Sequence, residues 1–215
     1  MENSRIREDV NLLAISLQKG QKVDLTKGRA GLSSLTVGLG WDPVTAEKSK
    51  GLFGGLFGGG STANVDCDAS VLMLDEKGKM PNKNSLIYFG NLKSADNSVR
   101  HSGDNLTGDG DGDDEQIVVD LKSISPSIHK LVFVVNIYSC VSRKQDFGMI
   151  QNAFIRLVDN SNNEELIHFN LTENYSGLTS LFVGEIYRHN GEWKFNAIGD
   201  GTKDTSISEI ANKYV

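Results

Sequence analysis

The segment SLFVGEIYRHNGEWKFNAIG (residues 180–199) contains two strand patterns joined by a short turn. In its second half Trp193, Phe195 and Ala197 alternate with polar residues, so they share one side of an extended chain. The pair Asn190-Gly191 suits a tight hairpin turn because both residues tolerate positive φ. The segment therefore predicts an antiparallel hairpin with one buried face and one wet face.

Short strand patterns of this kind recur along the chain. NAFIRLVD (152–159) and ELIHFNL (165–171) both alternate, and the polar NSNNE between them predicts a second hairpin. KLVFVVNIYS (130–139) begins with a continuous apolar run, which is typical of a central strand covered on both faces. With three prolines and 23 glycines, these strands indicate an all-β domain, a sandwich or a barrel.

Only the C-terminus has a helical pattern. Ser206 lies three residues before Glu209, as in a capping box. Ile207, Ile210 and Ala211 then fall on one face at helical spacing. A short C-terminal helix is expected.

We find no linker, so residues 1–215 are expected to form a single domain with one insertion. That insertion, at about 50–62, contains GLFGGLFGGGST and separates two predicted strands. We interpret it as a flexible loop whose Phe and Leu side chains are available for docking. It is not a phosphate-binding loop, because no Lys follows the glycines.

The formal charge has one source. The chain has 22 basic and 28 acidic residues, and its net charge is −6. Six of the acidic residues lie in GDNLTGDGDGDDE (103–115), and the rest of the chain is neutral. This balance argues against nucleic acid or an anionic membrane surface as a partner, because both need a basic footprint.

The chain has the features expected of a cytoplasmic protein. Cys67 and Cys140 form no spaced pair, so we expect two buried, reduced thiols. The apolar patch LLAISL (12–17) is too short for a membrane-spanning helix and lacks the pattern of a signal peptide. No direct membrane insertion is expected.

The acidic segment has the composition of a metal site. Asp109, Asp111 and Asp113 alternate with glycines, which allow the curled backbone that turns several oxygens inward. Oxygen ligands without His or Cys favour calcium or magnesium, and calcium accepts six to eight of them in flexible geometry. The remaining alternative is a solvated acidic loop. The candidate ligands in this segment are Asp104, Asn105, Asp109, Asp111, Asp113, Asp114 and Glu115.

The segment does not fit an EF-hand, and a second segment is expected to complete the cage. In the EF-hand alignment that begins at Asp109, Asp114 stands where Gly is required and Asp120 where Glu is required, and a strand pattern follows. In VDCDAS (65–70), Asp66 and Asp68 lie two residues apart, which puts both on one face of a strand. An exposed edge with solvated acids is the alternative for this pair.

Several segments together resemble the TerD family of bacterial tellurium-resistance and general stress proteins. They are ISLQKGQKVDLTK, VGLGWD, DCDAS, HSGDNLTGDGDGDDE, FVVNIYS, FGMIQNAFIRLVD and GEIYRHNGEWKFNAIGDG, in that order. The resemblance runs from about Ile15 to Gly201. It implies an antiparallel β-sandwich of two sheets with two neighbouring calcium ions, and a non-enzymatic role among the proteins of a cytoplasmic stress and tellurium-resistance system. Cys67 departs from the family, which has an aliphatic residue there, and so does the 50–62 insertion.

Two other functions stay open from the residues. A divalent-metal-dependent hydrolase acting on phosphoesters would use the acidic cluster, with His101 as its base. Direct thiol chemistry on tellurite would need reactive Cys67 or Cys140. Both are weakly supported, because no catalytic constellation with a recognisable local signature accompanies either.

Overall fold

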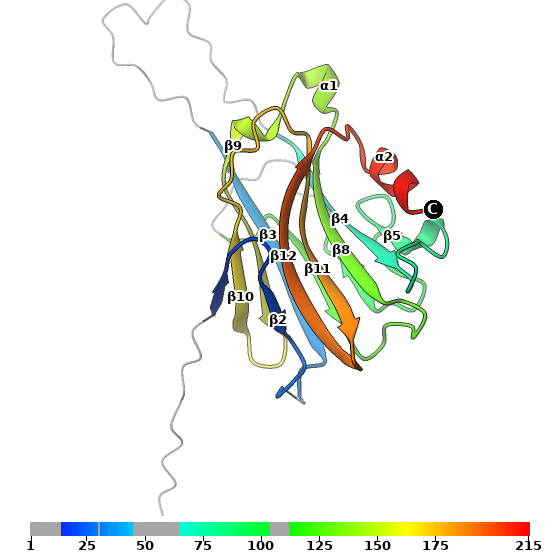
Figure 1. The fold of residues 1–215 in the computed structure, drawn as a ribbon. Helices are drawn as coiled ribbons and strands as arrows, with labels where there is room; N and C mark the ends of the chain where they lie inside the picture. The colour runs from blue at the N-terminus through cyan, green and yellow to red at the C-terminus, as the bar shows by residue number, and fades with distance from the viewer. Residues whose placement is uncertain (1–13, 30, 45–64, 104–111) are drawn as a thin grey trace, which may run out of the picture.

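The computed structural model describes residues 14–29, 31–44, 65–103 and 112–215, and these form two facing β-sheets (Figure 1). In order across the first sheet, sheet A, the strands are β1 (Ile15–Leu17), β10 (Glu164–Asn170), β9 (Ile150–Asp159), β3 (Ser34–Pro43), β7 (Glu115–Asp120) and β6 (Val99–His101). In sheet B they are β2 (Lys22–Asp24), β12 (Glu192–Thr202), β11 (Ser180–His189), β8 (Lys130–Ile137), β4 (Cys67–Leu74) and β5 (Leu86–Ile87). The predicted all-β sandwich of two sheets is confirmed.

Five short helical segments accompany the sheets in the described ranges: α1 (Cys140–Arg143), α2 (Ile207–Ala211) and the 3-10 turns η1 (Lys83–Ser85), η2 (Phe147–Met149) and η3 (Asn212–Tyr214). The core between the sheets is filled by apolar side chains from both of them. The 50–62 insertion lies outside the described residues.

The two predicted hairpins are present. β11 pairs with β12 antiparallel, and the turn residues Asn190 and Gly191 have φ of 52° and 81°. Trp193, Phe195 and Ala197 are buried on the inner face, as the alternation predicted. β9 pairs with β10 in the same antiparallel way, with Asp159 opposite Glu164.

β8 is covered on both faces, as its apolar run predicted. Phe133 and its inward neighbours lie in the core between the sheets, whereas Val132 and Val134 face outward. α2 covers that outer face with Ile207 and Ile210. The helix is capped at Ser206, whose Oγ accepts the backbone N–H of Glu209 at 3.2 Å.

A ten-residue N-terminal strap (residues 15–24) connects the two sheets. β1 pairs parallel with β10 in sheet A, and β2 pairs antiparallel with β12 in sheet B. The crossing between them is fixed by Gly20, whose N–H donates to Ala197 O at 2.7 Å. In Figure 1, β1 lies beside β10 and β2 lies beside β12. The division of these two strands between the sheets has no local signal in the sequence.

Candidate metal centre

Asp66 and Asp68 lie at the start of β4, on the outer face of sheet B. Cys67 between them points into the core, so strand alternation turns both carboxylates the other way. Asp68 stands opposite Asn136 of β8, and the Asp66 carbonyl accepts the N–H of Tyr138 at 2.7 Å. The predicted shared face of the two acids is confirmed, but they are buried rather than solvated, with exposures of 8% and 4%.

Two oxygens in this group are buried without a hydrogen-bond partner among the described residues. They are Asp66 Oδ1 and Asn136 Oδ1, and Asn136 is 4% exposed. Burying an oxygen without a partner costs folding free energy, and coordination to a hard cation can provide that partner. These oxygens, at the edge where Asp68 also lies, are donors of the chemical type that calcium accepts.

Arg143 forms an ion pair with Asp66. Its Nη1 lies 3.2 Å from Asp66 Oδ2, and its guanidinium lies 5.4 Å from the centre of the Tyr138 ring. It belongs to α1, which is flanked by Ser139 and Lys144 at φ of 52° and 53°. The sequence analysis missed α1, because a four-residue helix held by two left-handed residues has no periodic pattern.

Glu115 joins the two sheets beside this site. Its Oε2 accepts the backbone N–H of Ala69 at 2.6 Å, and His101 Nε2 lies 3.1 Å from the Ala69 carbonyl. Because the Gly103 N–H donates to His101 Nδ1, the ring proton is on Nε2 and points at that carbonyl. Side chains of β6 and β7 thus bond to the backbone of β4 at the part of its edge that β5 does not cover. His101 therefore has a structural role and is not free to act as a base.

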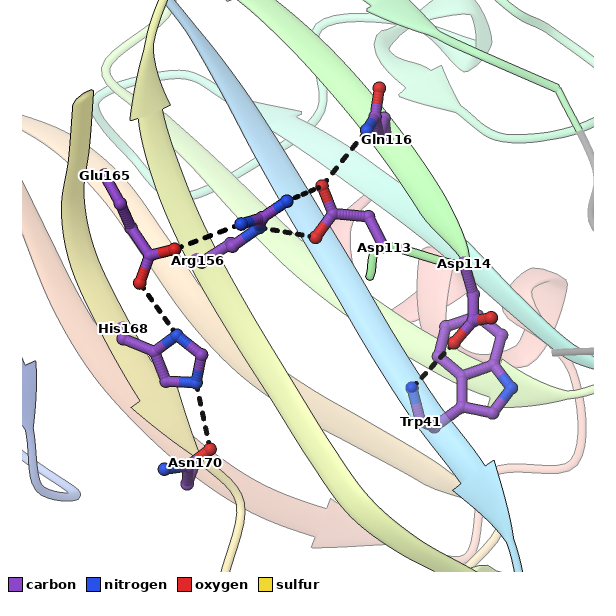
Figure 2. A network of polar contacts seen from close by, with 8 residues as sticks. All are labelled: Trp41, Asp113, Asp114, Gln116, Arg156, Glu165, His168 and Asn170. Carbon is purple, nitrogen blue, oxygen red and sulfur yellow. Dashed lines mark hydrogen bonds and ion pairs between the residues drawn. The ribbon is translucent and has the colours of Figure 1, made fainter. Parts of the chain in front are cut away.

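Asp113 is turned away from β4, toward the outer face of sheet A (Figure 2). Its carboxylate, 1% exposed, receives two hydrogen bonds from Arg156 of β9, at 2.6 Å from Nε and 3.0 Å from Nη2. Gln116 Nε2 donates a third at 3.1 Å. We call the Asp113–Arg156 pair the β9 clamp.

The β9 clamp extends into a polar row across sheet A (Figure 2). Arg156 Nη1 also lies 3.1 Å from Glu165, whose other oxygen lies 2.9 Å from His168 Nδ1. The carboxylate of Asp113 is seated over Gly38, where an added Cβ would lie 2.3 Å from it. Gly38 of β3 therefore leaves the space that the clamped carboxylate occupies.

Asp114 lies along the chain between Asp113 of the clamp and Glu115, the first residue of β7. Its Oδ2 accepts the backbone N–H of Trp41 at 2.7 Å, as Figure 2 shows. Burial, followed by the negative charges of Asp42, Glu115 and Asp113, raises the pKa of Asp114 to about 6, despite the Trp41 hydrogen bond that lowers it.

Asp66 and Asp68 flank Cys67 along the chain, and Glu115 contacts the next strand residue but one, Ala69. Burial first, and then the charges of Asp68, Asp66, Glu115 and Asp114, raise the pKa of the Cys67 thiol well above its usual value. Both cysteines are buried and free, as predicted, which leaves neither thiol suited to chemistry on tellurite.

The predicted ligands are thus only partly described. Asp104, Asn105, Asp109 and Asp111 lie outside the described residues. Asp66 and Asp68 lie at the start of β4, and Glu115 contacts the β4 backbone at Ala69. Asp114 contacts the Trp41 backbone, and Asp113 pairs with Arg156. Over the ranges that are described, no group of three or more His, Cys, Asp or Glu side chains is placed to hold a metal.

Sequence reasoning missed Asn136, Arg143 and Arg156. Asn136 interrupts the apolar run of β8, a signal that was available in the sequence. The two arginines carry no such signal, because their partners are 77 and 43 residues away along the chain.

Every helix in the described ranges falls short of the length and apolar character needed to cross a bilayer.

Known proteins resemble this chain over nearly its whole length. A family model described as the TerD domain matches residues 13–214. The chain is 64% identical over 203 residues to stress response protein SCP2 of Bacillus subtilis (strain 168), covering 94% of this chain and 100% of that protein. It is 41% identical over 189 residues to tellurium resistance protein TerD of Serratia marcescens, covering 88% and 91%.

A solved structure shares the fold. The crystal structure of a Streptomyces coelicolor A3(2) homologue of telluride resistance protein TerD gives a TM-score of 0.62 at 21% identity, covering 83% of this chain and 95% of that one. Fold and site together define a two-sheet β-sandwich that places two buried acids, Asp66 and Asp68, at the start of one central strand. The chain belongs to the TerD domain family, as its motifs indicated.

Proposed function

We propose that this chain is a calcium-binding, non-enzymatic module of a bacterial stress-response and tellurite-resistance system. Two calcium ions, held by Asp66, Asp68 and the acidic segment, would order the loops at that end of the sandwich. The ordered loops would present a surface to other proteins of the system in the cytoplasm. The relatives named for stress response and tellurium resistance support the cellular role.

One observation carries the metal part of the proposal. Asp66 Oδ1 and Asn136 Oδ1 are buried oxygens without a hydrogen-bond partner in the described ranges, next to Asp68. Calcium supplies positive charge and oxygen coordination at such a place, and its binding lets several carboxylates stand close together. Asn136 thereby enters the proposed ligand set, which the sequence had assigned to the acidic residues and Asn105.

The non-enzymatic part is supported by His101. This residue is 6% exposed, and both of its ring nitrogens are engaged with the backbone. A general base needs access to the proton that it removes. The hydrolase alternative therefore gains no support from the described residues.

Calorimetric titration of chelator-stripped protein with calcium, and separately with magnesium, tests the proposal. We expect two calcium sites and a preference for calcium. At 100-fold excess over the dissociation constant, one such site adds about 2.7 kcal/mol to the unfolding free energy, or roughly 5–10 °C in melting temperature.

A matched pair of variants locates the site. Asp66→Asn should weaken calcium binding, whereas Asp200→Asn, which removes an exposed carboxylate paired with Lys19, should leave it unchanged. The proposal is wrong if the stripped wild type shows neither binding heat nor a calcium-dependent shift in melting temperature.

A further inference from the structure

Two arginines contact acidic residues of the motif, and they do so in different ways. Arg156 holds Asp113 in the β9 clamp with two hydrogen bonds. Arg143 reaches Asp66 with one nitrogen only, at 3.2 Å. Because both acids belong to the predicted ligand set, this difference decides which of them is open to a metal ion.

Asp113 has little capacity left. Both of its oxygens are bonded to the Arg156 fork, Gln116 adds a further donor, and the carboxylate is 1% exposed. A bidentate arginine–carboxylate pair is among the stronger ion pairs, and pulling it apart leaves a buried charge. The clamp therefore belongs to the architecture of sheet A.

Asp66 is held far more loosely. One of its oxygens has no hydrogen-bond partner in the described ranges, and the other has the single Arg143 contact. The Arg143 side chain is 42% exposed, whereas that of Asp66 is 11% exposed. A single-contact ion pair whose cation is open to solvent is weaker than a buried bidentate pair, and its cation can move into water.

The position of Arg143 is nevertheless built into the fold. Cys140, buried at the start of α1, donates its Sγ–H toward Thr205 O at 3.6 Å and anchors the helix. Ser139 and Lys144 enclose α1 in left-handed conformations, which cost energy in residues other than glycine. The Tyr138 ring supports the guanidinium from one side.

We propose that Arg143 is a tethered cation that neutralises Asp66 when calcium is absent and competes with calcium for that carboxylate. This inference rests on the proposed function, and it assigns to Arg143 the setting of the calcium affinity. Without metal, the guanidinium stabilises a carboxylate that would otherwise be buried and unpaired. When calcium arrives, the exposed side chain swings into solvent and the metal takes its place.

The competition predicts two effects of opposite sign in Arg143→Gln. With chelator present, the melting temperature falls by about 1–4 °C because Asp66 loses its counter-charge. Calcium affinity rises about two- to fivefold, because the metal no longer displaces a cation. A residue that merely supported the site would lower both quantities when removed.

The test uses full-length protein, calorimetric calcium titration and melting in chelator. Lys144→Gln is the matched control, because it removes the same charge from the next, exposed residue and should change calcium affinity less than about twofold. Arg143→Lys keeps the charge and should keep the affinity within about twofold of the wild type.

The outcomes separate the two proposals. Tighter calcium binding in Arg143→Gln than in both other variants supports the competition. Unchanged or weaker binding in that variant, with wild-type binding intact, overturns the competition and leaves the proposed function standing. Absence of calcium binding by the wild type overturns the proposed function and the competition with it.

Discussion

Replacing Arg156 with Met is expected to be among the most destabilising changes on the outer face of sheet A. The substitution leaves the Asp113 carboxylate, 1% exposed, without the fork that gives it two hydrogen bonds. Removing one partner of a buried ion pair costs about 3–5 kcal/mol. Because the Arg156 side chain is 31% exposed and water can reach the gap, we expect about 2–3 kcal/mol of lost unfolding free energy.

The measurement is urea unfolding in chelator, with thermal melting as a second readout. A loss of about 2–3 kcal/mol corresponds to a fall of roughly 5–10 °C for a domain of this size. Asp113→Asn should cost less, about 1–2 kcal/mol, because it removes the charge as well as the pairing. The double variant should recover about 1 kcal/mol or more relative to the sum of the two single effects.

Arg100→Met is the control, because that arginine is exposed and contacts a backbone carbonyl, Asn97 O, at 2.9 Å. It should stay within about 0.5 kcal/mol of the wild type. If Arg156→Met also stays within that range, or if the single effects simply add, the β9 clamp is not the stabilising ion pair that its geometry indicates.

Three further predictions follow from the same structure. In chelator, the raised pKa of Asp114 stabilises the folded state below about pH 4 and loses this effect as the pH rises through about 6. The unfolding free energy of the wild type should therefore fall by about 1 kcal/mol over this pH range, after allowance for solvent screening. An equal fall in Asp114→Asn would contradict this prediction. Gly38→Ala should cost about 1–3 kcal/mol in urea unfolding, because its Cβ would overlap the clamped carboxylate, whereas Gly31→Ala, with open space around it, should be nearly neutral. Cys67 and Cys140 should react with a thiol reagent only at the rate of unfolding, and rapid labelling of the folded protein would refute their burial.

Local patterns in the sequence were sufficient for the hairpins, the central strand and the capped C-terminal helix. Each depends on neighbours within a few residues, such as Asn190-Gly191 or Ser206 with Glu209. The parallel pairing of β1 with β10 has no such local cause. It brings Ile15 opposite Ile167, and only the complete fold determines that contact.

The candidate site, too, could be predicted only in part from the sequence. The spacing of Asp66 and Asp68 correctly placed both on one face of β4, but the burial of that face depends on β8 and α1. The composition of the segment grouped Asp113 with the other acids, because composition does not show which way a side chain points. Its side chain turned toward Arg156 instead, as Figure 2 shows, because β9 offers a cation over the gap at Gly38.

The N-terminal strap has a consequence for how the protein is made. β1 and β2 leave the ribosome first, but their partners β10 and β12 begin at Glu164 and Glu192. At synthesis rates of about 5–20 residues per second, the first strands wait roughly 7–30 s before either partner exists. Sheet A lacks a strand until β10 has been made, and sheet B lacks one until β12 has been made. Until then the nascent strap has no strand partners and is exposed to chaperones and proteases.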